Sequence, residues 1–472
     1  MLKELKELHS YFEDEKWNVF SYYGNFYIVL LDFTIVIPIK KAMYNTLYKI
    51  KLNNDGISKM SIKEIEDLII LKDNLISSQI IIAEKLSAKL NLKEMNILKD
   101  ITIEITEDCN LRCSYCYGSF GNTRSKTLEE NIAKQIVDCI FEYPKLSKNL
   151  RINFFGGEPL LKFNLIADIV DYIEEKKNDI AIQYGITTNG TILNDEIIEF
   201  FRRYNFYVLV SSDGVKICND QNRKYKNGNG SFETINKNLI SLLRNKIPVK
   251  ALMILTPYSV RYFSENIKYF DSLGVKSISS NPFYHSSGIN ISPLRYNSQF
   301  EILEYHLKEL TKIIIQKLKN NEKFVKYEEL HIFVRKILNI NNENCPVCMA
   351  VFGSSVFIDS QGDFYPCTDF KCSSSKFKIG CIKTGFNFNK INLYMKKMKN
   401  TNELIDCKNC LIRNICAGLC LSQHVRINND YNETYTYYST ICNYKIAIFK
   451  AACYLMEKLN SNQIKAFLEY DY

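Results

Sequence analysis

Histidine is scarce in this chain, with 5 histidines among 472 residues. No two of them stand at a spacing typical of a shared metal site, which argues against imidazole-based metal binding (His9, His285, His306, His331 and His424). Cysteine, by contrast, occurs 16 times. If the protein holds a metal, it therefore holds it through sulfur, and all-sulfur sites bind zinc or iron–sulfur clusters.

Long apolar runs are also missing. The longest, from Phe26 to Ile39, is interrupted by Asp32 and Pro38 and is too short to span a bilayer. The N-terminus lacks the apolar core and small-residue cleavage site of a secretory signal. We therefore expect a cytoplasmic protein without a membrane partner. Thiols stay reduced in the cytoplasm, so the cysteines indicate metal rather than disulfides.

The chain has no long run of basic residues either. Its formal charge of +9 comes from interspersed Lys, Arg, Asp and Glu. This pattern is typical of a solvated surface, so no nucleic-acid partner is predicted, although an acidic peptide would suit it. The length is enough for about three domains at roughly 150 residues each.

Three cysteines follow a predicted strand in the first half of the chain. Residues Ile101–Thr106 alternate in a β-branched pattern, and Cys109, Cys113 and Cys116 come next with the spacing C-x3-C-x2-C. Three thiolates this close can hold one four-iron cluster and leave one iron open to a small molecule. A zinc knuckle, or thiols that are close only by chance, is the alternative.

This loop, with Tyr115 just before the third cysteine, resembles the signature of the radical S-adenosylmethionine (SAM) superfamily. The resemblance implies a [4Fe–4S] cluster on the three cysteines and SAM on its open iron, with Tyr115 close by. It also implies that one electron, from a flavodoxin- or ferredoxin-type donor, cleaves SAM to a 5′-deoxyadenosyl radical. That radical would take a hydrogen atom from a substrate.

Strands and helices alternate from Ile101 to about Pro282. Alternation of this kind predicts an α/β fold with a parallel sheet, whose ligands gather at the carboxyl ends of the strands. The family resemblance narrows this to a partial (β/α)6 radical SAM barrel. The expected strands are Ile101–Thr106, Leu150–Phe155, Ile180–Thr187, Phe206–Ser211, Val249–Leu255 and Val275–Ser280. The expected helices are Leu128–Phe141, Asn164–Lys176, Asp195–Arg203, Phe232–Leu243 and Ser264–Leu273.

A Gly-Gly-Glu-Pro motif follows the second expected strand. Its glycines, Gly156 and Gly157, let backbone approach a ligand closely, and the carboxylate of Glu158 suits an ammonium group. The motif resembles the GGEP motif of the superfamily, which implies that these residues hold the amino group of SAM.

Two polar segments follow the next two strands. Thr187–Gly190 offers Asn189 for ribose or carboxylate contacts, and Ser211-Ser212-Asp213-Gly214 is followed by Arg223. The second segment resembles SPASM-type radical SAM proteins, which implies that Ser211 and Arg223 contact SAM, the arginine through the SAM carboxylate. A turn with a solvated charge is the alternative for either segment.

The C-terminal part is rich in cysteine, with eleven between Cys345 and Cys453. Eight of them can form two closed four-cysteine sites for iron–sulfur clusters, and structural zinc is the alternative. Their order resembles the SPASM domain over its full length. The resemblance implies a first auxiliary [4Fe–4S] cluster on Cys345, Cys348, Cys367 and Cys420, and a second on Cys407, Cys410, Cys416 and Cys442.

Five cysteines remain outside these sites. We expect Cys139 and Cys453 in the core and Cys218 in a loop, while Cys372 and Cys381, near the first auxiliary cluster, leave a metal or substrate role open. In the anaerobic sulfatase-maturing relatives, an aspartate directly after a tail cysteine is the catalytic base. Here Thr368 follows Cys367, and Asp369 comes one residue later. We expect this offset to turn the Asp369 carboxylate away, which weakens the interpretation as a sulfatase-maturing enzyme.

The first 97 residues contain no cysteine. Three short strands, at Trp17–Tyr23, Tyr27–Leu31 and Thr34–Ile37, are followed by helical patterns from Lys40, from Ser61 and from about Ile81. Ser61 and Glu64 have the spacing of a capping box. This winged-helix-like module resembles domains that bind a precursor peptide as an added strand. A packing extension without a ligand is the alternative.

Together these patterns predict a precursor-peptide recognition module (1–97), a radical SAM core (98–292), a helical linker (293–344) and a SPASM domain (345–472). The resemblance implies an oxidoreductase that modifies a ribosomally made, cysteine-rich precursor peptide, through thioether crosslinking. The alternatives are another protein substrate, with carbon–carbon crosslinking or formylglycine formation, and a metal-binding protein without turnover. The SAM-pocket motifs argue against the last alternative.

Overall fold

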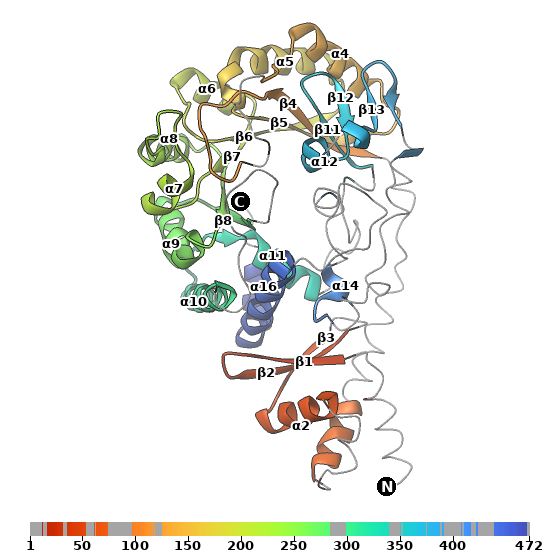
Figure 1. Ribbon diagram of the computed structural model, residues 1–472, viewed down its shortest axis with the longest axis vertical. Helices are drawn as coiled ribbons and strands as arrows, with labels where there is room; N and C mark the ends of the chain where they lie inside the picture. The colour runs from red at the N-terminus through yellow and green to blue at the C-terminus, as the bar shows by residue number, and fades with distance from the viewer. Residues whose placement is uncertain are drawn as a thin grey trace.

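The computed structural model describes most of the chain (Figure 1). The described residues are 12, 17–31, 35–52, 61, 63–73, 97–116, 118, 125–283, 299–338, 350, 353–373, 375–387, 389–390, 407, 410–416, 422 and 439–469. Three predicted ligands of the first auxiliary cluster, Cys345, Cys348 and Cys420, and the helix expected from Ile81 lie outside them. None of the helices in these ranges has the length and apolar character that a bilayer crossing requires.

A parallel sheet of consecutive strands forms the body of the molecule, with its helices on the outer face (Figure 1). Its first six strands are β4 (Leu98–Thr106), β5 (Leu146–Gly156), β6 (Ala181–Thr188), β7 (Tyr207–Ser211), β8 (Val249–Leu255) and β9 (Ser277–Pro282). The covering helices are α4 (Glu130–Phe141), α5 (Phe163–Lys176), α6 (Asp195–Arg203), α7 (Lys216–Asn222), α8 (Phe232–Arg244) and α9 (Phe263–Leu273), with the 3-10 turns η3 (Pro159–Lys162) and η4 (Ser259–Tyr262). The predicted α/β fold with six β/α units is confirmed.

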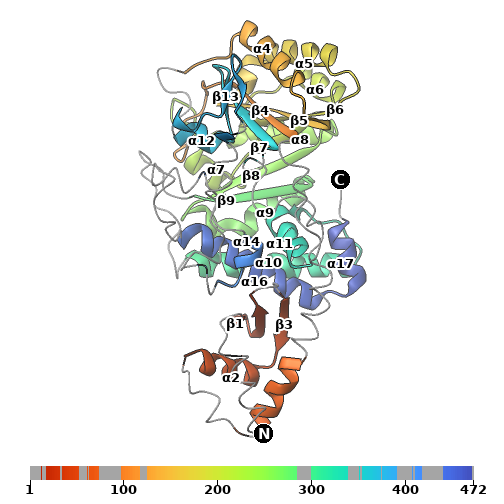
Figure 2. The same cartoon turned by 90° about the vertical axis from the view of Figure 1, so that its right-hand side faces the viewer.

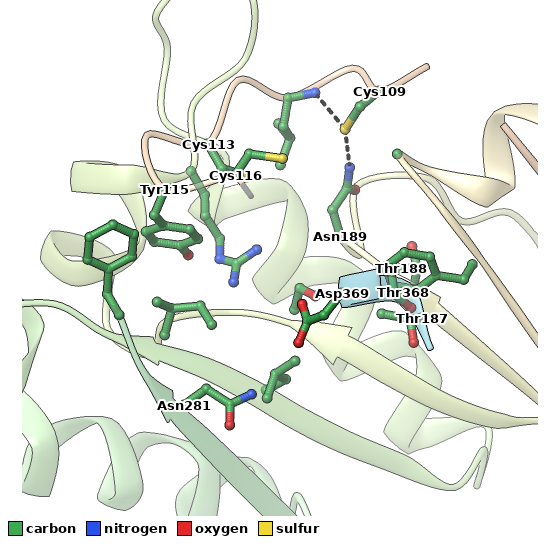
Figure 3. A pocket seen from close by; sticks show the side chains of 18 of the residues that line it. Cys109, Cys113, Tyr115, Cys116, Thr187, Thr188, Asn189, Asn281, Thr368 and Asp369 are labelled. Atoms are coloured by element: carbon green, nitrogen blue, oxygen red, sulfur yellow. Dashed lines mark hydrogen bonds between the residues drawn. The ribbon is translucent and has the colours of Figure 1, made fainter. Parts of the chain in front are cut away.

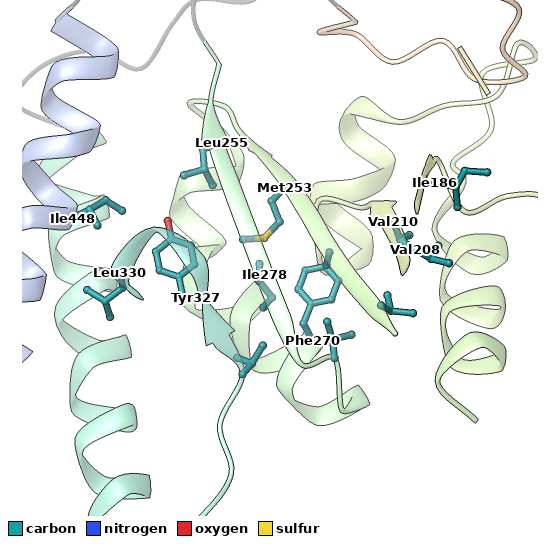
Figure 4. Close-up of a cluster of buried hydrophobic side chains, with 14 of the residues drawn as sticks. Ile186, Val208, Val210, Met253, Leu255, Phe270, Ile278, Tyr327, Leu330 and Ile448 are labelled. Atoms are coloured by element: carbon teal, nitrogen blue, oxygen red, sulfur yellow. The ribbon is translucent and has the colours of Figure 1, made fainter. Parts of the chain in front are cut away.

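The segment expected to be a linker belongs to the core. Strand β10 (Lys326–Tyr327) adds a further parallel strand beside β9, and helices α10 (Gln299–Lys319) and α11 (Glu328–Ile337) bury one face each. Tyr327 and Leu330 pack near Ile278 and Ile448 in the same apolar cluster (Figure 4). The Lys- and Glu-rich composition of this segment obscured its apolar positions at helical spacing.

The cysteine-rich tail reaches both edges of the open sheet. Strand β11 (Ser355–Ile358) pairs in parallel with β4 and continues into the antiparallel strands β12 (Asp363–Tyr365), β13 (Gly380–Cys381) and β14 (Gly385–Phe386). Helix α12 (Thr368–Ser373) follows β12, with η5 (Ser375–Phe377) after it. At the other edge, α16 (Ser439–Lys458) packs against α10 and α11, and α14 (Arg413–Cys416) lies beside α11 (Figures 1 and 2). The last helix of the described part is α17 (Ser461–Leu468).

The N-terminal module is a three-stranded antiparallel sheet with helices on one face (Figure 2). It contains β1 (Trp17–Tyr22), β2 (Asn25–Leu30), β3 (Ile35–Ile39), α2 (Lys41–Leu52) and a helical stretch at 63–73. Tyr23 and Gly24 both have positive φ, as a two-residue hairpin turn requires. Ser61 and Glu64 bond each other's backbone N–H, which confirms the capping box.

The module is fixed to the body by the other face of its sheet. Phe20 packs on Phe449 of α16, the Tyr22 hydroxyl donates to the Glu304 carbonyl, and Tyr27 bonds the Glu457 carboxylate. Apolar residues of this face belong to the same continuous core as the barrel. The module is therefore joined to the body by buried apolar contacts as well as by hydrogen bonds.

Candidate functional site

A cavity of about 630 Å³ lies at the carboxyl ends of the strands (Figure 3). Its lining comes from three parts of the chain: the cysteine loop after β4, the ends of the core strands, and the tail. The predicted site residues that line it are Cys109, Cys113, Tyr115, Cys116, Gly156, Gly157, Asn189, Ser211, Arg223 and Cys367. Pockets of this size at this end of a parallel sheet are typical ligand sites.

The cysteine loop is held by the end of α7 and the segment that follows it. The Arg112 N–H donates to the Lys224 carbonyl at 2.7 Å, and the Ser114 N–H donates to the Asn222 carbonyl at 2.9 Å. The Arg112 guanidinium turns back and donates to the Cys109 carbonyl at 2.7 Å. These bonds fix the path of the loop, so the three cysteines lie on the same side of the cavity.

The thiols of this loop are close enough to influence one another. Burial raises the pKa of Cys109 to about 11 and that of Cys113 to about 12; the neighbouring thiol of Cys116 adds to both, whereas Arg223 opposes the rise at Cys113. The Cys109 Sγ accepts the Leu111 N–H at 3.4 Å and the Asn189 amide at 3.7 Å. Such N–H···S bonds are a known means of tuning cluster potentials.

This donor set fits a four-iron cluster. Within the described ranges, no three His, Cys, Asp or Glu side chains converge on a single metal ion. A cubane cluster does not require such convergence, because each thiolate binds a different iron. Burial disfavours free thiolates here, so binding would release protons as the metal takes the deprotonated sulfurs.

The two glycines of the Gly-Gly-Glu-Pro motif pack against the cysteine loop. A Cβ on Gly156 would lie 2.2 Å from the Thr106 carbonyl oxygen, and one on Gly157 would lie 2.1 Å from the Asp108 carbonyl oxygen. The Gly157 N–H donates to the Thr106 carbonyl at 2.7 Å. The sequence predicted that these glycines let the backbone come close to a ligand. The structure shows that they also let it come close to the backbone at the start of the cysteine loop.

The Glu158 side chain lies behind the cavity wall. Its carboxylate is fully buried and accepts from the Leu160 N–H at 3.1 Å, the Thr188 hydroxyl at 2.8 Å and the Asn189 N–H at 2.7 Å. Burial raises its pKa to about 7, although these donors favour the ionised form. Glu158 is absent from the cavity lining, so this arrangement does not show the predicted contact with a ligand.

Asn189 uses its side-chain amide within the protein. The amide nitrogen donates to Asn110 Oδ1 at 2.8 Å as well as to the Cys109 sulfur, and its oxygen accepts from Thr191. Asn189, which directly follows β6, therefore positions the cysteine loop across the intervening strand β5. Ser211, at the end of β7, lines the cavity as predicted from its place after the strand.

Arg223 and Tyr115 share a buried carboxylate. Arg223 Nη2 lies 3.2 Å from Asp213 Oδ1, and the Tyr115 hydroxyl donates to Asp213 Oδ2 at 2.5 Å. The guanidinium lies over the Tyr115 ring, 5.3 Å from its centroid. Because Arg223 also lines the cavity, its guanidinium presents a cation to a ligand while Asp213 fixes its orientation.

The tail completes the lining of the cavity. Cys367, Thr368 and Asp369 all line it, and Asp369 Oδ2 accepts the Ser422 hydroxyl at 3.2 Å. Our expectation that the one-residue offset would turn the Asp369 carboxylate away is wrong (Figure 3). Thr368 and Asp369 both lie in the first turn of α12, and this turn brings both side chains to the cavity wall.

The four cysteines assigned to the second auxiliary cluster lie near one another. Burial raises the pKa of Cys442 to about 12, and the thiols of Cys416, Cys410 and Cys407 add to that rise. Lys445 Nζ donates to the Cys416 sulfur at 3.5 Å. This grouping fits the ligand set that the family resemblance implies. Of the first set, only Cys367 lies in the described part of the chain.

The remaining cysteines have separate environments. Cys453 is buried in α16, and Cys139 is partly buried against the same core, as expected. Cys218 was expected in a loop, but the turn at Gly214 leads directly into α7, where Cys218 is fully buried; it is absent from the cavity lining. Cys372 and Cys381 are partly exposed in the tail.

Several lining residues were not anticipated from the sequence. Ile441, Tyr444 and Lys445 of α16 line the cavity, as do Asn281 and Phe283 at the end of β9. The contribution of α16 could have been inferred from the sequence, because Lys445 lies about one helical turn after the predicted cluster ligand Cys442. The β9 residues could have been inferred from their position at a strand end.

Comparison with known proteins identifies a family. The sequence profile of the radical SAM superfamily matches residues 103–270. An uncharacterized protein of Methanocaldococcus jannaschii is 30% identical, over 64% of this chain and 94% of its own length. A cysteine-type anaerobic sulfatase-maturating enzyme of Clostridium novyi is 27% identical, over 67% of this chain and 85% of its own length.

Solved structures share the fold. The anSMEcpe structure with bound AdoMet superposes with a TM-score of 0.65 at 20% identity, covering 79% of this chain and 98% of that chain. The structure of Streptococcus suis SuiB bound to S-adenosylmethionine superposes with a TM-score of 0.54 at 14% identity. The match covers 91% of this chain and 99% of the SuiB chain. Residues 98–472 amount to about four fifths of the sequence, so the SuiB match must include more than half of residues 1–97.

Proposed function

Because this chain belongs to the radical SAM superfamily, whose cofactors are SAM and a [4Fe–4S] cluster, we propose that it is a peptide maturase. Its proposed substrate is a ribosomally made, cysteine-containing precursor peptide, and the proposed product is a thioether between a cysteine sulfur and a carbon. The observation that carries this choice is the N-terminal module, which is packed on the barrel and of which more than half falls within the match to SuiB. SuiB itself has been solved bound to its precursor peptide SuiA.

The module offers an edge for an extended peptide. Within the described part of the chain, β3 pairs only with β2, and we propose that its other side takes an added strand. Tyr44 and the exposed Tyr48 stack beside this sheet on α2, with Tyr44 against Phe26. We propose that the leader part of the precursor pairs with β3 and that the cysteine-containing part reaches the cavity.

The residues of the site have separate proposed roles. Cys109, Cys113 and Cys116 would hold the cluster, while the Gly156–Gly157 backbone, Ser211 and Arg223 face the space for SAM. When bound, the cluster and SAM supply a radical that takes hydrogen from the substrate. A flavodoxin- or ferredoxin-type protein is the proposed electron donor. The tail cysteines would hold the two auxiliary clusters, which would accept the electron released when the carbon–sulfur bond forms.

Asp369 is the proposed base. Among the described residues that line the cavity it is the one carboxylate (Figure 3), and Cys367 lines the same cavity. Forming a thioether requires the cysteine thiol of the substrate to lose a proton, and a carboxylate within reach can take it. The hydrogen bond from Ser422 holds the Asp369 carboxylate in place.

The test is anaerobic co-expression with a small cysteine-containing peptide encoded beside the gene, followed by mass spectrometry. We expect a loss of two hydrogens per crosslink and protection of the crosslinked cysteine from alkylation. Removal of the leader should abolish the modification. An unchanged peptide mass, although the same protein cleaves SAM after reduction, would contradict the proposal.

The position of Asp369 favours a second candidate, formylglycine formation on a protein. The relative from Clostridium novyi is named for that activity on cysteine. A carboxylate in the cavity would serve the proton removal that this oxidation needs as well. The same experiment with a sulfatase-derived cysteine peptide separates the two, because formylglycine carries an aldehyde oxygen where the cysteine sulfur was.

A further inference from the structure

A lysine of the tail is buried against the strand that leads into the cysteine loop. Lys371 Nζ, from α12, lies 3.1 Å from Glu104 Oε1 in β4 and 2.6 Å from Glu107 Oε1 at the start of the loop. The Glu104 side chain is fully buried, and the lysine side chain is 16% exposed. The second oxygen of Glu104 accepts the Ser360 N–H of the tail at 3.3 Å.

Glu104 is an unusual residue for the middle of a buried parallel strand. Burial raises its pKa, and the ammonium of Lys371 opposes that rise by favouring the carboxylate. A charge in such a place is tolerated when it is paired and hydrogen-bonded. Both of its partners, Lys371 and the Ser360 N–H, come from the tail, so the carboxylate of the core and the cation of the tail depend on each other.

The ion cluster joins the two walls of the cavity. Glu107 lies two residues before Cys109, and Lys371 lies two residues after Asp369 in the same short helix. Cys109 and Asp369 both line the cavity, one from the core and one from the tail. A shift of Lys371 relative to Glu104 and Glu107 would therefore change the spacing between the cysteine loop and the Asp369 carboxylate.

We propose that Lys371 is a positioning residue that fixes Cys367 and Asp369 relative to the cysteine loop, so that SAM cleavage is coupled to modification of the substrate. The inference rests on the proposed SAM-dependent modifying activity. Lys371 itself is absent from the cavity lining, so it acts through α12 and not by contact with the substrate. A displacement of about 1 Å at a reacting group is enough to lower a rate by about 10²-fold.

The test compares Lys371→Met and Lys371→Arg in the full, cluster-loaded chain. A matched control is Lys378→Met, because Lys378 pairs with Asp363 of the same tail but makes no ion pair with the core among the described residues. In each variant, 5′-deoxyadenosine and modified peptide are measured in the same reaction, together with iron content. The ratio of modified peptide to 5′-deoxyadenosine reports coupling.

We expect Lys371→Met to keep its iron and its SAM cleavage but to lower that ratio by about 10²-fold. Lys371→Arg, which keeps the cation, should recover most of it, and Lys378→Met should leave it unchanged. An unchanged ratio in Lys371→Met, or a loss of product that only parallels a loss of iron, would overturn the proposal. If Lys371→Met does not fold, Glu107→Gln tests the same contact and leaves the Glu104 pair intact.

Hydrogen exchange separates this inference from the proposed function, because it requires no substrate. In Lys371→Met, the amides of residues 107–116 and 367–373 should exchange faster than in the parent, while those of α8 should not change. If the parent protein modifies no peptide, but Lys371→Met still shows this faster exchange relative to the parent, the proposed function fails and the positioning contact stands. If exchange is unchanged in both segments, the positioning contact is refuted.

Discussion

Replacement of Gly157 by alanine tests how the Gly-Gly-Glu-Pro turn supports the cysteine loop. The added Cβ would lie 2.1 Å from the Asp108 carbonyl oxygen and 2.8 Å from that of Glu107, whereas ordinary contact begins at 3.4 Å. The loop must therefore retreat by more than 1 Å, since both obstacles are backbone atoms. The retreat strains the 2.7 Å bond from Gly157 and the 2.8 Å bond from Glu158 to the loop.

The cost follows from these contacts. Overpacking a rigid site costs about 1–3 kcal/mol, and each weakened hydrogen bond adds about 1 kcal/mol. A total near 3 kcal/mol lowers the population of the native loop by about 10²-fold, at 1.4 kcal/mol for each factor of ten. We expect SAM cleavage by Gly157→Ala to fall by at least that factor.

The assay is anaerobic release of 5′-deoxyadenosine, with iron content as a second measurement. Loss of the core cluster alone would leave ~8 of ~12 irons in the two tail clusters, at four irons per cluster. Gly228→Ala is a stringent control for the clash, because a Cβ there meets nothing within 4 Å although the φ of +87° strains an alanine. A Gly157→Ala protein with parental cleavage and full iron would refute the packing argument.

Three further predictions concern buried groups. Asp213→Asn leaves the Arg223 cation uncompensated in a site where both side chains are at most 6% exposed. We expect the free energy of unfolding, measured by urea denaturation, to fall by about 3–5 kcal/mol. A decrease under about 1 kcal/mol would contradict this expectation. Burial raises the pKa of Glu158 from 4.5 to about 7, so the native state binds its proton more tightly than the unfolded state and stability falls as pH rises through that window. Glu158→Gln should lack this fall when urea midpoints are compared across the window, and parallel pH profiles would count against the assignment. Cys442→Ala should lower iron from ~12 to ~8 per chain while SAM cleavage persists; unchanged iron would exclude Cys442 as a ligand.

Local patterns predicted the barrel well, because its elements follow from hydrophobic periodicity. Val249–Leu255 alternates between the two faces of the sheet, and Asp195–Arg203 has a capped start and an apolar stripe; both have the predicted bounds. The positions of the cavity residues at strand ends followed from the parallel topology. The chemistry of the cysteine loop was also local, because its three thiols lie within eight residues.

Long-range contacts were not predictable in the same way. The orientation of Asp369 depends on how α12 sits against β4, and that depends on Lys371 and Glu104, which are 267 residues apart. Glu158 was expected to face a ligand, but its three hydrogen-bond donors include neighbours on β6 that no local pattern reveals. The part that α16 plays in the cavity likewise depends on its packing against α10 and α11.

The parallel pairing of β11 with β4 has a consequence for how the tail can be studied. Without residues 355–358, the long strand β4 would present a row of unpaired backbone groups along a mostly buried, apolar strand. Exposed edges of that kind recruit other chains and lead to aggregation. A shortened protein that lacks the tail would therefore precipitate for reasons unrelated to its iron. Single cysteine substitutions, which keep β11 in place, are the sound way to ask what the auxiliary clusters do.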